Sequence, residues 1–194
     1  TGVLIGNLGH LPLVRGLDFH LYGDYGLNVF NSRSLAYLKD KELESACVSF
    51  ELRFAQIRDL KKVLRAEAIV YGRLPLMITE NCLVQNETGC RLDRQGPCVP
   101  EDGPCRCGQP NVLVDRTGAA FPLLPAYGHR TEIQNSKPLY LADRPEHRRL
   151  GLAYARLRFT TETAEECVSV VQNYLDAAPA AGDFTRGLYE RGVE

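Results

Sequence analysis

The first 72 residues alternate between short apolar runs and segments of helical spacing, and this alternation constrains the fold more than any other feature of the sequence. The runs predicted as strands cover residues 3–6, 18–24, 44–50 and 66–72. Helices are predicted at residues 31–41, where Asn31 or Ser32 can cap the first turn, and at residues 51–64. Strands that alternate with helices in this way are typical of βαβ units, so we predict an α/β fold with a parallel sheet.

The alternation stops after residue 80. Residues 81–109 have neither a helical nor a strand period and are rich in Gly, Pro, Cys and charged residues. The later predicted elements are a β-hairpin around Arg116-Thr117-Gly118, short strands at 137–143 and 152–159, and a capped helix at 163–178. We therefore expect three parts: parallel β/α units in 1–80, a cysteine-rich insertion with a hairpin in 81–135, and final β/α units with an irregular tail in 136–194.

Composition and charge exclude some classes of function. The chain has 194 residues, of which 44% are hydrophobic and 24% charged, as in a globular domain with a full core. The net charge of -1 gives no bulk attraction to nucleic acid or membranes. Arginines do cluster between residues 144 and 158, and His147 among them is expected to be solvated. No apolar run reaches the roughly 18 residues of a membrane span, and without a recognisable secretion signal we expect a cytoplasmic location.

Most cysteines lie in one polar stretch. Five of the seven are Cys82, Cys90, Cys98, Cys105 and Cys107. Their spacing lacks the C-x2-C pair of zinc knuckles, so disulfides and plain thiols stay open as alternatives, although a reducing location favours a metal. The predicted zinc ligands are Cys82, Cys105, Cys107 and His129, with Cys90 and Cys98 as substitutes. An iron–sulfur cluster is the alternative cofactor. A closed set of ligands leaves no position for water, so the predicted metal is structural.

Six segments together carry a family resemblance. They are "GDYGLNVFNSRSLAYL", "ELRFAQIRDL", "AIVYGRLPLMITENC", "VDRTGAAFPLL", "NSKPLYLAD" and "FTRGLYERG". In this order they resemble the U-32 peptidase family, the collagenase-like proteins. The resemblance implies a TIM-barrel-like (β/α) fold, of which this chain would form the C-terminal portion. It implies either a peptidase of unknown catalytic type or an oxygen-independent hydroxylase of RNA bases or ubiquinone that uses a four-cysteine iron–sulfur cluster.

The functional residues of the family can be compared with this chain position by position. Glu67 and Gly72 match the family signature, and Cys82 matches a cluster-ligand cysteine. Pro75 and Tyr140 stand where the cluster-binding members have two of their cysteines. The resemblance therefore favours zinc over an iron–sulfur cluster in this chain, and a peptidase over a hydroxylase.

Candidate catalytic residues follow the predicted strands. Neither H-E-x-x-H nor G-x-S-x-G is present. Catalytic groups of (β/α) barrels follow the carboxyl ends of the strands. Asp24 and Glu51 occupy such positions as carboxylates, and Arg73 does so as a binder of an anion or carbonyl group. Arg156 and Arg158 alternate on the last strand, where a phosphate site would support an RNA substrate, but we favour a solvated strand face.

The sequence thus predicts a U-32 peptidase family protein with a metal-binding domain and a peptide or RNA substrate. The alternatives are a hydroxylase-type enzyme that modifies RNA or a small molecule, and a non-catalytic domain that binds a partner. Because the chain begins partway round the implied barrel, we expect an open parallel edge. Such an edge requires either a missing N-terminal barrel segment or self-association.

Overall fold

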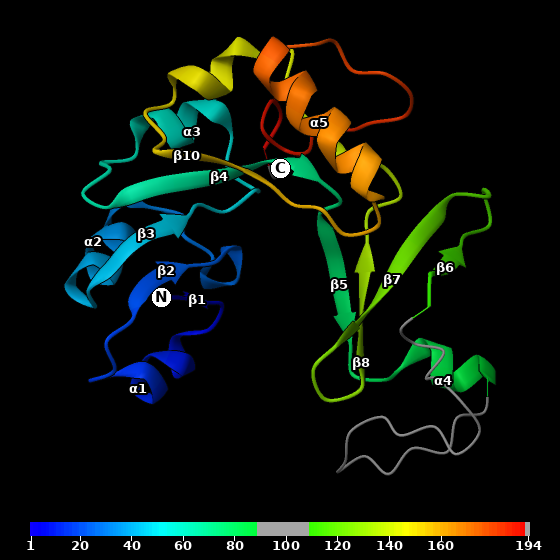
Figure 1. The fold of residues 1–194 in the computed structure, drawn as a ribbon, viewed down its shortest axis with the longest axis horizontal. Helices are drawn as coiled ribbons and strands as arrows, with labels where there is room; N and C mark the ends of the chain where they lie inside the picture. The colour runs from blue at the N-terminus through cyan, green and yellow to red at the C-terminus, as the bar shows by residue number, and fades with distance from the viewer. Residues whose placement is uncertain (89–108, 193–194) are drawn as a thin grey trace. The chain divides into compact units, whose positions relative to one another are not determined.

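The computed structural model describes residues 1–88 and 109–192 (Figure 1). These residues form two compact units. The first comprises Thr1–Gly72, Leu139–Arg158 and Glu165–Glu194, and the second comprises Arg73–Pro138 and Phe159–Ala164. Each unit therefore combines segments that are distant in the sequence.

A parallel sheet is the main feature of the first unit. Its parallel strands lie in the order β1 (Gly2–Ile5), β2 (His20–Gly23), β3 (Leu43–Cys47), β4 (Arg65–Gly72) and β10 (Tyr154–Leu157). All neighbours in this order pair in the parallel sense, and the short strand β9 (Leu139–Tyr140) joins β4 in the antiparallel sense. The predicted α/β fold with a parallel sheet is confirmed, and Figure 1 shows the strands following one another in chain order.

Helices lie between successive strands, as the alternation predicts, and one more helix follows β10. The α-helices are α1 (Leu11–Val14), α2 (Ser32–Asp40), α3 (Phe54–Asp59) and α5 (Ala164–Asp176), and the 3-10 helices are η1 (Leu8–His10), η2 (Tyr25–Leu27) and η4 (Pro145–Arg149). The cap of α2 is Asn31, one of the two predicted alternatives. Oδ1 of Asn31 accepts hydrogen bonds from the backbone N–H groups of Arg33 and Ser34, both at 3.0 Å. Leu35 and Leu38, which share one face of the helix, are buried.

Helix α3 is shorter than the predicted segment 51–64. It ends at Asp59 because Leu60 takes an extended backbone conformation, with ψ of 130°. The N–H of Lys61 then donates to the side-chain oxygen of Ser32 at 2.8 Å. A tertiary hydrogen bond thus replaces the next helical turn, and local spacing in the sequence cannot show such a bond.

The C-terminal segment is irregular, as predicted, but it packs firmly against β4. Tyr189 is 1% exposed, and its hydroxyl donates to the carbonyl oxygen of Ile69 at 2.6 Å. The Tyr189 ring stacks on Phe54 with 5.3 Å between ring centroids. The guanidinium of Arg186 donates to both carboxylate oxygens of Asp143, at 2.6 and 2.8 Å. This segment therefore belongs to the core of the first unit.

His147 is buried, so the expectation of a solvated imidazole is wrong. Only 6% of the residue is exposed, and its Nδ1 contacts the carbonyl oxygen of Arg144. The imidazole also packs edge-on against Tyr174, with 6.2 Å between centroids. Burial lowers the pKa of His147 below its ordinary value. In a single 3-10 turn with three adjacent basic side chains, the sequence gives no sign of which one faces inward.

The second unit is an antiparallel sheet with one helix, α4 (Leu83–Thr88). Its strand order is β5 (Pro75–Thr79), β8 (Arg130–Gln134), β7 (Ala120–Ala126) and β6 (Asn111–Val114). The predicted hairpin is confirmed between β6 and β7. There the Asp115 carboxylate accepts the N–H groups of Thr117 and Ala119, at 2.8 and 3.0 Å, and Gly118 has a φ of +85°. Within the two described ranges, no helix is long and apolar enough to cross a membrane.

Candidate active site at the carboxyl edge of the parallel sheet

Polar side chains gather where the parallel strands of the first unit end. Asp24 follows β2, Ser49 and Glu51 follow β3, and Arg158 follows β10. Because the strands run in the same direction, their carboxyl ends share one edge of the sheet, termed the carboxyl edge here. Open and closed α/β sheets bind their ligands at this edge.

Arg156, on β10, joins two carboxylates near this edge. Its Nη2 lies 2.6 Å from Oε1 of Glu67 on β4, and its Nε lies 3.2 Å from Oε2, which makes a bidentate pair. Its Nη1 donates to Oδ1 of Asp24. The side chains of Arg156, Glu67 and Asp24 are 19%, 11% and 22% exposed, respectively. The cluster is therefore mostly buried, and Asp24 is its most exposed member.

The backbone explains why these three side chains meet. Glu67 is paired with Tyr154 of β10 and with Cys47 of β3. Because side chains alternate along a strand, Arg156 lies on the same face as Tyr154, one step nearer the carboxyl edge. Asp24 is the N-cap of η2, and its Oδ1 also accepts the backbone N–H of the next residue at 2.8 Å. This cap fixes the carboxylate beside Arg156.

The cluster holds one positive and two negative charges. Burial lowers the pKa of Arg156, but its hydrogen bond to Glu67 and the neighbouring negative charges raise it by more, so the guanidinium stays charged. Both contacts of the Asp24 carboxylate are made by Oδ1, and Oδ2 has no hydrogen-bond partner among the described residues. Asp24 thus presents an open carboxylate oxygen at the carboxyl edge, which is the chemistry that a general base requires.

Cys47 lies beside the cluster but is not a nucleophile. Its side chain is fully buried, and its Sγ lies 3.5 Å from the carbonyl oxygen of Val48. Burial raises the pKa of the Cys47 thiol to about 12, Arg156 opposes this shift, and the cluster carboxylates add to it. Because only a thiolate attacks, Cys47 is inert near neutral pH.

The predicted catalytic residues have different partners. Asp24 belongs to the cluster just described. Glu51 lies at the same edge, where its N–H donates to Oγ of Ser49 at 3.4 Å. Arg73 belongs to the second unit, where its Nη1 donates to the carbonyl oxygen of Asn135 at 3.0 Å. The structure therefore joins Asp24 to Glu67 and Arg156, and catalytic roles for Asp24, Glu51 and Arg73 stay predictions.

Sequence reasoning missed the partners of Asp24. The interpretation of Arg156 as part of a solvated strand face is wrong, because the side chain is held between two carboxylates. Glu67 was identified only as a match to the family signature. A usable signal does exist: Glu67 is a lone acid inside the apolar run 66–72, and Arg156 is a base inside another predicted strand. Charged residues are almost never buried without a partner, so two such strands predict an ion pair.

A second group at the carboxyl edge combines a cation with aromatic rings. The guanidinium carbon of Arg158 lies 5.5 Å from the centroid of the Tyr25 ring, and Tyr25 lies 6.0 Å from Phe50 between centroids. These residues follow β10, β2 and β3, respectively. The arrangement holds a guanidinium in place at the edge, where it can bind a carbonyl or an anionic group.

The structure describes two of the predicted metal ligands. Cys82 is 8% exposed and directly precedes α4. Oγ1 of Thr131 accepts the N–H of Leu83 at 3.1 Å, so Cys82 lies beside the strand that starts next to His129. The other predicted members, Cys90, Cys98, Cys105 and Cys107, lie outside the described residues. No group of three or more metal-binding side chains occurs within residues 1–88 and 109–192, so the zinc site, the alternative iron–sulfur cluster and the cysteine-rich character of the insertion stay predictions.

We expect protein purified anaerobically to contain about one equivalent of zinc and to be colourless, since thiolate and imidazole ligands suit zinc. Elemental analysis with an absorbance spectrum on the same sample measures this. Substitution of Cys105 and Cys107 with serine should remove the zinc, whereas Cys167→Ser on α5 should retain it. A brown protein with about four irons would indicate an iron–sulfur cluster instead, and a protein with neither metal would exclude both sites.

The described structure is that of a mixed α/β protein with a parallel sheet and a carboxylate–arginine cluster near the carboxyl edge of that sheet. Residues 2–114 match the family described as Peptidase family U32, and the chain belongs to this family. The match includes Asp24 and Glu67, whereas Arg156 lies beyond it. Comparisons with curated proteins and with solved structures found no match.

Proposed function

We propose that this chain carries the catalytic edge of a peptide hydrolase. The observation that supports this most is the Asp24–Arg156–Glu67 cluster, which combines an open carboxylate oxygen with a fixed guanidinium at the carboxyl edge. Membership of Peptidase family U32 supports this reaction class. The proposed substrate is accordingly a peptide.

In the proposed reaction, Asp24 acts as the general base. Its Oδ2 takes a proton from a water molecule, whose oxygen attacks the carbonyl carbon of the scissile bond. Arg158 binds the carbonyl oxygen as that oxygen becomes negative. The proton held by Asp24 then passes to the leaving nitrogen, and the C–N bond breaks. Arg156 and Glu67 are positioning residues that hold the Asp24 carboxylate in place.

The hydroxylase-type alternative has less support in this chain. Tyr140, at one position where cluster-binding relatives have cysteine, belongs to an aromatic core. Its ring centroid lies 6.5 Å from Tyr71 and 5.6 Å from Tyr174, and its hydroxyl donates to the carbonyl oxygen of Ala178 at 2.9 Å. Pro75, at the other such position, begins β5. Neither residue supplies a sulfur ligand.

We also propose that the first unit is a portion of a (β/α) barrel. Its parallel strands lie in chain order, as in singly wound barrels, whereas doubly wound sheets reverse their order at a switch point. A barrel would direct the carboxyl edge towards a common mouth, where several strand ends contribute to one site.

Replacing Asp24 with asparagine is expected to lower kcat/KM for peptide hydrolysis by roughly 10²–10⁴-fold, the contribution of a general base. Asparagine keeps the shape of the side chain and an oxygen that can cap η2, so the fold should persist. Release of amino groups from a mixture of unstructured peptides measures the rate. The matched control is Asp18→Asn, an exposed carboxylate just before β2, which should retain full activity. A folded Asp24→Asn protein with wild-type activity would contradict the proposed role, and a wild-type chain without activity would favour a partner-binding domain.

A further inference from the structure

Two aromatic side chains lie at the carboxyl edge beside the proposed general base. Tyr25 directly follows Asp24, and its ring centroid lies 6.0 Å from that of Phe50. Both residues are partly exposed, and they come from the loops that follow β2 and β3. One residue of an extended peptide spans only about 3.5 Å. A peptide bond held at Asp24 therefore places a neighbouring side chain of the same peptide near these two rings.

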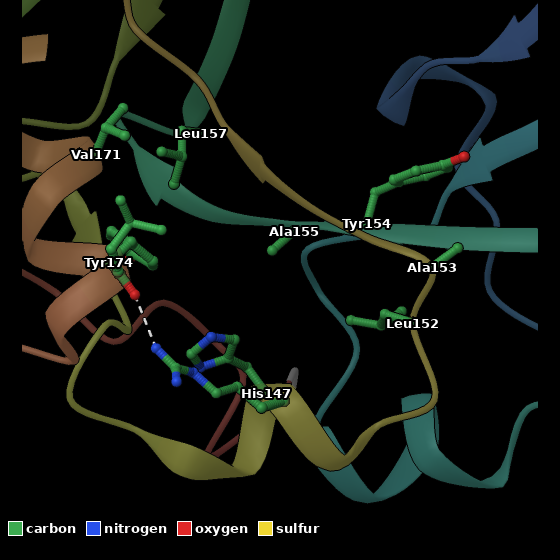
Figure 2. Close-up of a pocket in the computed structure, with 10 residues that line it drawn as sticks. His147, Leu152, Ala153, Tyr154, Ala155, Leu157, Val171 and Tyr174 are labelled. Carbon is green, nitrogen blue, oxygen red and sulfur yellow. Dashed lines mark hydrogen bonds between the residues drawn. The ribbon is translucent and has the colours of Figure 1, made fainter. Parts of the chain in front are cut away.

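Strand β10 presents different residues on its two faces. Ala155 and Leu157 line a hollow of about 310 Å³ together with Val171 of α5 (Figure 2). Because side chains alternate along a strand, Arg156 lies on the opposite face, and Arg158 continues that alternation beyond the end of the strand. The hollow therefore lies on the face of β10 opposite the carboxylate–arginine cluster and is not part of the carboxyl-edge site.

Backbone contacts hold the two rings in place. A Cβ at Gly26, next to Tyr25, would lie 2.5 Å from the carbonyl oxygen of Gly6, so η2 packs closely on the segment that follows β1. The loops after β2 and β3 are joined by a parallel bridge between Val29 and Val48, and the N–H of Ser49 donates to the carbonyl oxygen of Val29 at 3.0 Å. Positions that are fixed before a ligand binds reduce the entropy that binding costs.

The charges around the rings favour an apolar ligand group. The guanidinium carbon of Arg158 lies 5.5 Å from the centroid of the Tyr25 ring, so a second cation at this ring would be repelled. The planes of Tyr25 and Phe50 are tilted by 53°. Aromatic groups pack favourably on such partly exposed rings in offset or edge-on geometry, and large aliphatic groups bury apolar area against them.

We infer that Tyr25 and Phe50 form a specificity subsite for an aromatic or large aliphatic side chain next to the scissile bond. This inference rests on the proposed hydrolysis and narrows its substrates to peptides that carry such a residue on one fixed side of the cleaved bond. Asp24 and Arg158 act on the scissile bond itself, whereas Tyr25 and Phe50 bind the neighbouring side chain.

Cleavage of peptides that differ at one position tests the preference. The peptides are alanine-based and carry Phe, Gly, Lys or Asp at that position, and mass spectrometry locates the cleaved bond. The kcat/KM for the Phe peptide is expected to exceed that for the Gly peptide by roughly 10–200-fold, the range of discrimination by an apolar pocket. Phe50→Ala should remove most of this ratio, and Phe50→Leu, which keeps an apolar side chain, should remove less. The matched control is Tyr37→Ala, an aromatic residue on α2 that is 47% exposed, which should keep the wild-type ratio.

Peptide binding can be measured separately from hydrolysis. The chain contains no Trp, so the fluorescence anisotropy of a single Trp in a Gly-Ser peptide reports binding without a signal from the protein. Asp24→Asn protein, which should not cleave the peptide, is expected to bind it. Adding Phe50→Ala to this variant should raise the Kd by roughly 10–100-fold, the effect of losing the burial of one large apolar side chain. Adding Tyr37→Ala should leave the Kd unchanged.

The two measurements distinguish the subsite from the proposed reaction. Hydrolysis with no preference for Phe, or with a preference for Asp, would overturn the inference and leave the proposed function intact. Trp-peptide binding that Phe50→Ala weakens, without hydrolysis of any peptide by the wild type, would support the subsite and reject the proposed hydrolysis. Absence of binding, or binding that Phe50→Ala and Phe50→Leu leave unchanged in folded protein, would overturn the inference.

Discussion

Replacing Gly72 with alanine is expected to lower the free energy of unfolding by roughly 2–6 kcal/mol, the sum of backbone strain and overpacking. Gly72 ends β4 with a φ of +119°, which L side chains rarely adopt. A Cβ at this position would also lie 2.0 Å from the carbonyl oxygen of Arg158. That carbonyl cannot simply move away, because the N–H of Arg158 donates to the carbonyl oxygen of Tyr71 at 2.9 Å.

Urea denaturation followed by circular dichroism measures the loss. The matched control is Gly16→Ala, because Gly16 has a φ of +79° and nothing within 4 Å of a Cβ built on it. In that variant the free energy of unfolding should fall only by the cost of a left-handed backbone at an L residue, about 1–2 kcal/mol. Equal losses in the two variants would show that the approach of Arg158 to Gly72 contributes nothing, and that glycine is needed there only for its φ.

Short-range patterns in the sequence predict the first unit well. Strands β1 to β4 and helix α2 were identified because their signals are local: apolar runs, helical spacing and the Asn31 cap. Parallel pairing followed from the alternation of strands with helices. Helix α5 and the β6–β7 hairpin were identified for the same reason, from a capping pattern and from the turn residues near Gly118.

The candidate site was not predictable from local patterns. Arg156 is 132 residues from Asp24 and 89 residues from Glu67. The lone charges inside two predicted strands can suggest an ion pair, but they do not indicate that Asp24 joins it. Only the register of β10 against β4 brings the three together, and register is a tertiary property. The family signature identified Glu67 but gave no partner for it. The burial of Tyr189 was likewise not predictable from the sequence, since an irregular segment has no periodic pattern that indicates a buried face.

Tertiary structure also decides which residues near a strand end can act together. Arg73 directly follows β4, so in the sequence it is as good a candidate for the carboxyl edge as Asp24 and Glu51, which also follow strands. In the structure the chain enters the second unit at Arg73, where its guanidinium binds backbone carbonyl groups, one of them that of Asn135. The sequence alone does not show that the side chain of Arg73 is engaged by backbone carbonyl groups of the second unit.

Replacing Arg156 with methionine is expected to cost roughly 3–5 kcal/mol of unfolding free energy at neutral pH, because it leaves buried carboxylates without their countercharge. Glu67 loses both of its bonds to Arg156, and its side chain is only 11% exposed. Methionine fills a similar apolar volume, so a cavity contributes little to the loss. Arg156→Lys should lose less unfolding free energy, because lysine keeps the positive charge. Some loss should remain, because lysine cannot form the bidentate pair with Glu67.

The double variant Glu67→Gln/Arg156→Met separates charge from packing. Its uncharged amide needs no countercharge, so the double variant should lose less unfolding free energy than the two single variants lose together, by a coupling energy of about 0.5–3 kcal/mol. Urea denaturation of the wild type, both single variants and the double variant completes the cycle. Additive losses of unfolding free energy would show that Arg156 and Glu67 do not interact.

Arg156 is also expected to affect function through Asp24. If Arg156 holds the Asp24 carboxylate in place, Arg156→Met should lower kcat for peptide hydrolysis, and Arg156→Lys should restore part of it.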